Sequence, residues 1–172
     1  MADHRQPLRL LLLGGSGQVG TAWQRLMTPG DVSTQLKFPS RHELDLANAQ
    51  AVRDWVLHER PHLIVNAAAY TAVDKAESEP ELAHALNATL PTTLAQAAQD
   101  VGAALIHYST DYVFAGEGVH PHREADPVHP LSVYGKTKAE GETGIRRHMS
   151  RHLILRTSWV MGSHGGNFLD TM

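Results

Sequence analysis

The chain lacks cysteine altogether, and it has no excess of positive charge. With no cysteine among its 172 residues, disulfide bonds and thiolate metal sites are excluded. Its 15 Lys and Arg are outnumbered by 18 Asp and Glu, which gives a net charge of −3. Because nucleic-acid-binding domains generally carry a basic patch or a basic excess, this balance argues against nucleic acid as a partner.

Long apolar runs are missing as well. The leucine run at residues 10–13 is far shorter than the roughly 20 residues that cross a bilayer, and it is short for a signal peptide. We therefore expect no membrane partner and a cytoplasmic location. Hydrophobic residues make up 42% of the chain and charged residues 19%, which is typical of a folded globular domain.

What the chain does contain is an alternation of short apolar runs and amphipathic segments. The strand-like runs are residues 8–13, 35–38, 63–65, 103–108 and 153–155, and helical spacing is found at 19–27, at 52–56, at 79–101 and around Tyr134. Strands that alternate with helices predict an α/β fold: a Rossmann-type, doubly wound parallel sheet in three α/β/α layers. Ligands of such sheets bind at the carboxyl ends of the strands.

Two details refine this prediction. Pro91 lies inside the long helical segment, so we expect a kink or a break there. Residues 115–131 are rich in Gly, Pro and His and are interpreted as a loop. No internal repeat or linker interrupts the pattern, so residues 1–172 are expected to form a single domain.

A glycine-rich turn follows the first predicted strand. Gly14, Gly17 and Gly20 have the spacing G-x-x-G-x-x-G, which permits a tight turn, close approach of a pyrophosphate and helix packing. The N-terminus of the next helix then offers free N–H groups to phosphate. Residues 1–172 are therefore predicted to be an NAD(P)-binding Rossmann domain. The predicted cofactor-binding residues of this turn are Gly14, Ser16, Gly17, Gln18, Val19 and Gly20.

The residues after the second predicted strand bear on which dinucleotide binds. NAD-binding proteins usually place an acidic residue about 20 positions past the glycines, whereas this chain has Ser40 and Arg41 there. Arginine pairs strongly with phosphate. We therefore expect Arg41 to bind a 2′-phosphate and NADPH to be the cofactor, with NADH as the alternative; the simpler interpretation is a solvated loop arginine.

Tyr134 and Lys138 are one helical turn apart, so they share a helix face. A phenol with a pKa near 10 is a poor acid at neutral pH, but a nearby ammonium group lowers that pKa. Tyr134 could then give a proton to a carbonyl oxygen as hydride reaches its carbon. The simpler interpretation is an accidental pair on a surface helix.

Polar residues follow the fourth strand-like run. Ser109, Thr110 and Asp111 are expected to face the cofactor crevice, where a hydroxyl could hold a substrate carbonyl and a carboxylate could orient its neighbours. The simpler interpretation is a turn cap. Trp159, which follows the last predicted strand, is expected to face substrate, whereas Trp23 and Trp55 lie on core faces of helices.

Histidine is abundant, with 12 in the chain, and His120, His122 and His129 suggest a metal site. These residues lie in the Pro-rich loop without the fixed spacing of a ligand set. We therefore predict no metal site.

With these residues in hand, the chain resembles the extended short-chain dehydrogenase/reductase family, and more narrowly its dTDP-4-dehydrorhamnose reductase group. The runs that carry the resemblance are residues 14–20, 43–46, 64–77, 107–114, 134–138 and 156–160. The resemblance implies NADPH-dependent, sometimes NADH-dependent, reduction of the C4 keto group of a dTDP-linked sugar in dTDP-rhamnose biosynthesis.

The resemblance also implies roles for single residues. Thr110, Tyr134 and Lys138 would form the catalytic set, with Asp111 close by, and Lys138 would also bond the nicotinamide ribose. The implied cofactor contacts are Asp45 and Leu46 near the adenine and Ala67, Ala68 and Ala69 along the cofactor.

Members of this group continue for roughly another domain half, which binds the dTDP-sugar and, in some, a magnesium-linked dimer contact. We therefore expect the sugar-binding portion to be absent or truncated here and any Mg²⁺ ligands to lie outside this chain. A homodimer is the candidate assembly. Two alternatives share the fold: a non-catalytic protein resembling the regulatory subunit of methionine adenosyltransferase, and another nucleotide-sugar epimerase or dehydratase. The intact Tyr134, Lys138 and Thr110 favour an enzyme.

Overall fold

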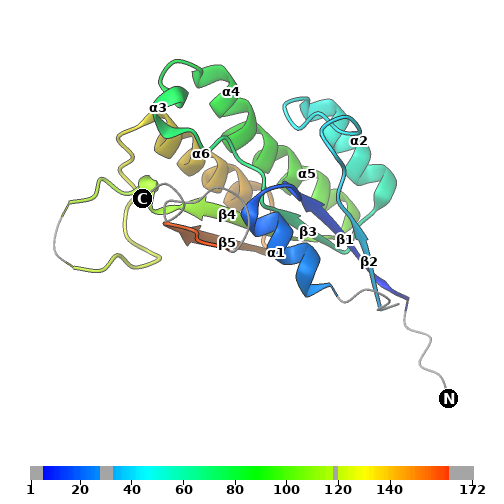
Figure 1. The fold of residues 1–172 in the computed structure, drawn as a ribbon. Coiled ribbons are helices and arrows are strands. Elements are labelled where there is room, and N and C mark those ends of the chain that lie inside the picture. Colours follow the sequence, from blue (N-terminus) through cyan, green and yellow to red (C-terminus); the bar gives the residue numbers. More distant parts are fainter. Residues whose placement is uncertain (1–5, 28–32, 118–119, 163–172) are drawn as a thin grey trace.

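A computed structural model describes residues 6–27, 33–117 and 120–162. Within these residues, parallel strands form one five-stranded sheet in the order β2-β1-β3-β4-β5 (Figure 1). The strands are β1 (Leu8–Leu13), β2 (Thr34–Lys37), β3 (Leu63–Asn66), β4 (Ala104–Thr110) and β5 (His152–Thr157).

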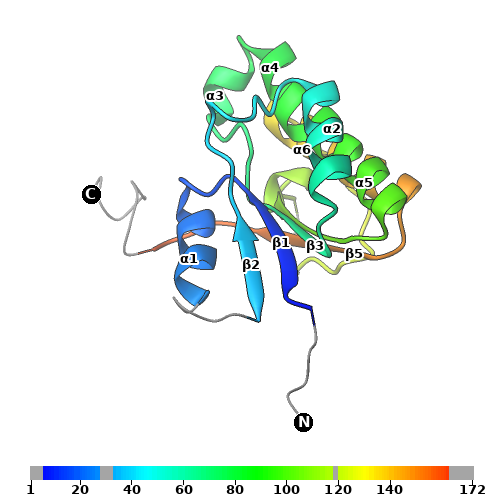
Figure 2. The same cartoon turned by 90° about the vertical axis from the view of Figure 1, so that its right-hand side faces the viewer.

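Helices cover both faces of the sheet, as Figure 2 shows. Helix α1 (Gln18–Leu26) packs on one face, and α2 (Ala49–Glu59), α5 (Leu90–Val101) and α6 (Val133–His148) pack on the other. The remaining helical segments are α3 (Val73–Ala76), α4 (Pro80–His84), the π-helical turn η1 (Ala85–Thr89) and the 3₁₀ turn η2 (Asp111–Val113). The predicted Rossmann-type sheet in three layers is confirmed.

The leucines of β1 explain why the sheet can be covered twice. Leu11 and Leu13 belong to the core cluster under α2, α5 and α6, whereas Leu10 and Leu12 belong to the cluster under α1. A strand buried on both faces needs apolar side chains at every position.

The direction of winding reverses between β1 and β3, because α1 and α2 lie on opposite faces. At such a switch point, the loops after the neighbouring strands separate and leave a crevice at their carboxyl ends. The glycine turn follows β1 and the segment 67–69 follows β3, so both predicted cofactor-binding segments border this point.

The helical stretch that contains Pro91 is interrupted, as predicted, and the break precedes the proline. Pro91 lies in the first turn of α5, directly after the π-helical turn η1. Proline has no N–H for the carbonyl of Asn87, four residues earlier. That carbonyl faces α6, where a Cβ on Gly141 would lie 2.2 Å from it, so the break lets α6 pack closely.

Two strands run further than their apolar residues predict. β4 continues through Ser109 to Thr110, and β5 continues through Arg156 to Thr157; the register pairs Ser109 with Arg156 and Thr110 with Thr157. In the predicted loop 115–131, the described residues form no helix or strand. Among the described residues, no helix is both long enough and apolar enough to span a membrane.

Candidate active site

The glycine turn is locked against the loop that follows β3. Gly14 has a φ of +77°, and a Cβ on it would lie 2.6 Å from backbone atoms of Ala67 and Ala68. A Cβ on Gly20 would lie 2.1 Å from the Gly14 carbonyl oxygen. These two glycines are therefore required by the protein's own packing, and they bring the turn and the predicted cofactor-lining segment 67–69 into contact.

Gly17 is different, because the protein leaves space beside it. A Cβ there would meet only the Gly14 carbonyl oxygen, at 3.4 Å, an ordinary contact distance. Gly17 is also the N-cap of α1, and no side chain caps that helix end or places a negative charge in its first turn. The helix dipole and the backbone N–H groups of the first turn therefore suit a phosphate.

The loop after β2 forms the next part of this edge. A Cβ on Gly15 would lie 3.4 Å from Phe38, which places the loop beside the glycine turn. The backbone N–H of Ser40 donates to the Glu43 carboxylate at 2.8 Å, and Arg41 between them is exposed. Hydrogen bonds from Ser40 lower the pKa of the Glu43 carboxyl group.

Asp45 and Leu46 lie further along the same loop, between β2 and α2. The exposed Asp45 accepts a hydrogen bond from the Ala47 N–H at 3.0 Å, and Leu46 packs against the core. Both stay candidates for the adenine end, because their loop shares the edge with the glycine turn.

The predicted catalytic groups meet where β4 ends against α6. Thr110 is buried, donates to Asp111 at 3.1 Å and accepts from the Tyr112 N–H at 3.2 Å. The Tyr134 ring lies edge-on to Tyr112, with ring centroids 5.5 Å apart, and its phenol shares a hydrogen bond with Thr110. Thr110, Asp111 and Tyr134 thus form one cluster.

The phenol of Tyr134 behaves differently from the sequence prediction. Its pKa is raised, chiefly by burial, and Asp111 and Tyr112 act in the same direction while the Thr110 hydrogen bond opposes them. Lys138 does not lower it, because the ammonium group points toward β4: it donates to the Tyr108 carbonyl oxygen and lies 3.5 Å from Nε2 of His107. Tyr134 is therefore held as a neutral phenol.

Lys138 is among the most deeply buried side chains in the described chain, with 1% of its surface exposed. Burial lowers its pKa to about 8, although the charge of Glu142 acts to raise it. Its neighbour His107 is a neutral imidazole, since burial and Lys138 hold the pKa of His107 well below its usual value. His107 in turn contacts the buried amide of Asn66 at 3.1 Å.

Ser109 corrects a second sequence prediction. Its hydroxyl does not face the crevice, because successive strand residues point to opposite faces and Ser109 turns toward α6. There it donates to the Glu142 carboxylate at 2.6 Å. Thr110 and Asp111 keep the predicted position at the strand end.

Trp159 follows β5 and is 68% exposed, with a φ of +49°. That it faces substrate stays a prediction. Trp23 and Trp55 pack against the core clusters, as predicted, and the Trp23 indole donates to the Tyr108 hydroxyl at 3.0 Å.

Sequence reasoning missed several buried polar residues around this cluster. Asn87 uses its amide to bind both backbone groups of Tyr70 and the hydroxyl of Thr137, which ties the loop after β3 to α6. Asn66 and His107 support Lys138, and Glu142 binds Ser109. The one available signal was the spacing of Tyr134, Lys138 and Glu142, each four residues from the next.

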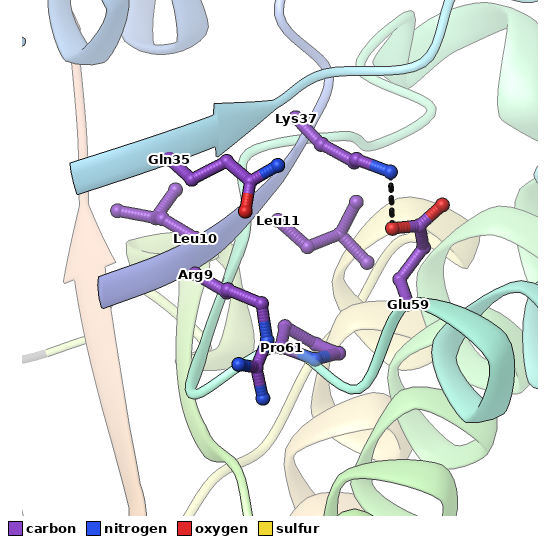
Figure 3. Close-up of a pocket in the computed structure, with 7 residues that line it drawn as sticks. All are labelled: Arg9, Leu10, Leu11, Gln35, Lys37, Glu59 and Pro61. Atoms are coloured by element: carbon purple, nitrogen blue, oxygen red, sulfur yellow. Dashed lines mark hydrogen bonds and ion pairs between the residues drawn. The ribbon is translucent and has the colours of Figure 1, made fainter. Parts of the chain in front are cut away.

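The one small pocket that the close-up in Figure 3 shows lies elsewhere. It is lined by residues of β1, β2 and the end of α2, and an ion pair between Lys37 and Glu59 borders it. None of the predicted site residues lines it. Among the described residues, no group of three or more His, Cys, Asp or Glu side chains is arranged to hold a metal ion.

Comparison with known proteins bears on this geometry. Residues 8–172 match the family model described as the RmlD substrate binding domain. A dTDP-4-dehydrorhamnose reductase of Shigella flexneri is 49% identical over 96% of this chain and 56% of its own length. The chain thus spans about half the length of the curated relatives it matches.

Solved structures agree in fold. A dTDP-4-dehydrorhamnose reductase of Bacillus anthracis in complex with NADP superposes with a TM-score of 0.91 at 36% identity, over 98% of this chain and 60% of that one. A Clostridium acetobutylicum dTDP-4-dehydrorhamnose reductase superposes with a TM-score of 0.89 at 39% identity, over 95% of this chain and 57% of that one.

Proposed function

Because the chain belongs to the RmlD substrate binding domain family, we propose that it is the nicotinamide-nucleotide half of a reductase. The proposed reaction is NADPH-dependent reduction of the C4 keto group of dTDP-4-dehydrorhamnose to dTDP-L-rhamnose. The observation that carries the proposal is the meeting of Thr110, Asp111 and Tyr134 at the end of β4, with Lys138 one turn along α6. The named relatives are reductases of this substrate.

The residues around the glycine turn fit a dinucleotide. The space beside Gly17 and the uncapped N-terminus of α1 suit a pyrophosphate, and the exposed Arg41 suits a 2′-phosphate. Ser16, Gln18 and Val19 belong to the same turn, and backbone atoms of Ala67 and Ala68 lie against Gly14. We propose that these residues, with Ala69, contact the cofactor. The Bacillus anthracis structure contains NADP, which supports NADPH over NADH as the cofactor of this chain.

The proposed chemistry divides between cofactor and protein. The nicotinamide, when bound, supplies hydride to the keto carbon. Tyr134 gives its phenolic proton to the keto oxygen, and its raised pKa keeps that proton in place until the oxygen becomes basic. Thr110 positions the same oxygen by a hydrogen bond. The ammonium group of Lys138, which binds the Tyr108 carbonyl oxygen, would hold the nicotinamide ribose rather than act on the Tyr134 phenol.

Other parts of the prediction stay open. A homodimer, a contact of Trp159 with substrate and a cytoplasmic location remain predictions from the sequence. No ligand set for Mg²⁺ was found among the described residues, and no observation favours the regulatory or epimerase alternatives over the reductase.

Cofactor binding is the first test, because it does not depend on sugar binding. Titration of the chain with NADPH and NADH, followed by nicotinamide fluorescence, should show saturable binding with NADPH preferred. Gly17→Ala should fold normally, since its Cβ has room, but should lose at least about tenfold in affinity for both cofactors, because the methyl group fills the space proposed for the pyrophosphate. Unchanged affinity in a folded Gly17→Ala protein would remove the pyrophosphate from this turn.

Catalysis is tested separately with the dTDP-linked keto sugar. In any form of the protein that turns over, Tyr134→Phe should keep NADPH affinity and lose reduction by a factor of about 10³ or more, since the proposed proton donor is removed. Retained reduction would exclude Tyr134 as the proton donor.

A further inference from the structure

Glu142 is a fully buried carboxylate on the same face of α6 as Tyr134 and Lys138. Its side chain has 0% exposure, and the three residues follow one another at intervals of four, so they line one helix face. A lone charge in such a place is costly and persists only when hydrogen bonds and opposite charges surround it.

Both carboxylate oxygens of Glu142 are bound by donors from three elements. From β4, the Ser109 hydroxyl donates to one oxygen at 2.6 Å. From β5, Arg156 binds both oxygens, at 2.9 and 2.7 Å, and from α6 itself Arg146 donates at 2.9 Å. Burial acts to raise the pKa of Glu142, but these partners prevail and lower it, so the group is a carboxylate at neutral pH.

This cluster fastens α6 to the strand that carries Thr110. Ser109 directly precedes Thr110. The residue before Ser109, Tyr108, accepts a hydrogen bond from Lys138 at its carbonyl oxygen. Thr157, the residue after Arg156, donates to the Ser109 carbonyl oxygen at 3.3 Å. Tyr108 and Ser109 are thus hydrogen-bonded to α6 and β5 immediately before Thr110.

We propose that Glu142 is a positioning residue, which, through Ser109 and Arg156, sets the spacing between α6, with Tyr134 and Lys138, and the end of β4, with Thr110. Its meaning for catalysis rests on the proposed function, whereas the positioning itself does not. Arg146 lies on the same helix as Glu142, so its ion pair links nothing across elements.

The carboxylate has a second consequence, for the charge of Lys138. The groups that face Lys138 are the neutral imidazole of His107 and the Tyr108 carbonyl oxygen from β4, and Glu142 from its own helix. The neighbouring turn η1 presents the uncharged Asn87 to Thr137, on the adjacent face of α6. Glu142 is thus the negative charge that favours the ammonium form of Lys138 against burial.

Lysine NMR tests this on the chain itself, without cofactor or substrate. The lysines of the chain are Lys37, Lys75, Lys136 and Lys138, so ¹³C-labelled lysine side chains give few signals, and Lys138 is the one that titrates near pH 8. Glu142→Gln should move the Lys138 midpoint down by about 1 pH unit, because the carboxylate is removed while both arginines stay. Arg147→Ala, a change at an exposed arginine of the same helix, should leave it in place.

Hydrogen exchange tests the geometric part. Glu142→Gln and Ser109→Ala should both speed amide exchange at least about fivefold in residues 105–113, with no change in α2, which lies far from the cluster. Ser109→Ala keeps every charge, so it should leave the Lys138 midpoint unchanged, and it tests the link even where Glu142→Gln does not fold.

A merely structural ion pair predicts something else. Its loss would speed exchange equally in residues 105–113 and in α2, and that result overturns the positioning role. A Lys138 midpoint that stays in place in Glu142→Gln overturns the effect of its charge on Lys138. Because neither readout involves NADPH, a failed cofactor titration would count against the proposed function and not against this role of Glu142.

Discussion

The two ends of the candidate site, the glycine turn after β1 and the end of β4, are shaped by different parts of the chain. At the glycine turn, the shape is made by backbone: Gly14 and Gly20 allow contacts that no side chain would permit, and Gly17 leaves an open space. At the end of β4, the shape is made by buried polar side chains, with Lys138 and Glu142 almost without exposure.

The difference shows how each end is specified. The shape of the glycine turn depends on glycines at fixed spacing, so a short stretch of sequence specifies it. A buried polar cluster depends on partners from β4, β5 and α6 that meet only when the sheet is complete. The first end is local, and the second is a product of the whole fold.

The largest expected effect is a loss of stability at the glycine turn. Gly20→Ala should reduce the free energy of unfolding by about 3 kcal/mol, because the added Cβ would lie 2.1 Å from the Gly14 carbonyl oxygen. Urea denaturation measures the loss. Gly102→Ala is the matched control: its φ is +73° but nothing lies within 4 Å, so strain alone should cost about 1 kcal/mol. Equal losses in the two variants would mean that close packing of the turn contributes little.

Sequence reasoning predicted the local end well. The apolar run of β1, the glycine spacing and the helix after it predict a strand, turn and helix that the structure confirms. The order of strands and helices predicts the three layers. These features depend on neighbours along the chain, which is why a single sequence is enough to find them.

The buried end was predicted only in part. Tyr134, Lys138, Thr110 and Asp111 follow from spacing and from the resemblance, but the direction of the Lys138 ammonium group does not. That direction depends on the Tyr108 carbonyl oxygen and on His107, and the raised pKa of Tyr134 depends on how deeply α6 packs. Such facts need the distances between strands and helix.

The second prediction tests the burial of Lys138 through pH. Burial lowers the pKa of Lys138 to about 8 from the 10.5 of an ordinary lysine. Between these values, the unfolded chain therefore binds more protons than the folded one. Stability therefore rises with pH in this window and is lost as pH falls toward 8. From pH 8 to pH 10, this one group should add about 2 kcal/mol to the free energy of unfolding.

Urea denaturation across this pH range measures the effect as a difference between variants. Lys138→Met should lose this rise, whereas Lys136→Met, a change at an exposed lysine on the same helix, should keep it. The same pH dependence in all three proteins would show that Lys138 keeps an ordinary pKa.

The third prediction concerns the proposed contact between Arg41 and the 2′-phosphate of NADPH, near the glycine turn. Arg41→Ala should weaken NADPH binding about tenfold and leave NADH binding unchanged, because only NADPH carries the 2′-phosphate that the guanidinium would bind. Competition titrations with both cofactors give the ratio. Arg60, which has a left-handed φ at the end of α2, is a poor control, so Arg53→Ala, a change in an ion pair on α2, serves instead. Equal weakening of both cofactors by Arg41→Ala would contradict the phosphate contact.

The smallest expected effect concerns Glu43, a charged side chain in the loop beside the glycine turn. Its carboxylate holds the Ser40 N–H at 2.8 Å beside Arg41, so a negative charge lies next to the place proposed for a phosphate. Glu43→Gln keeps a hydrogen-bond acceptor for Ser40 but removes that charge. NADPH affinity should then rise about twofold at low salt, and the gain should vanish at high salt, because exposed charges are screened. NADH affinity should not change. A fall in NADPH affinity would mean that the charge of Glu43 is needed to shape the loop, and that side-chain chemistry governs this end as it governs the other.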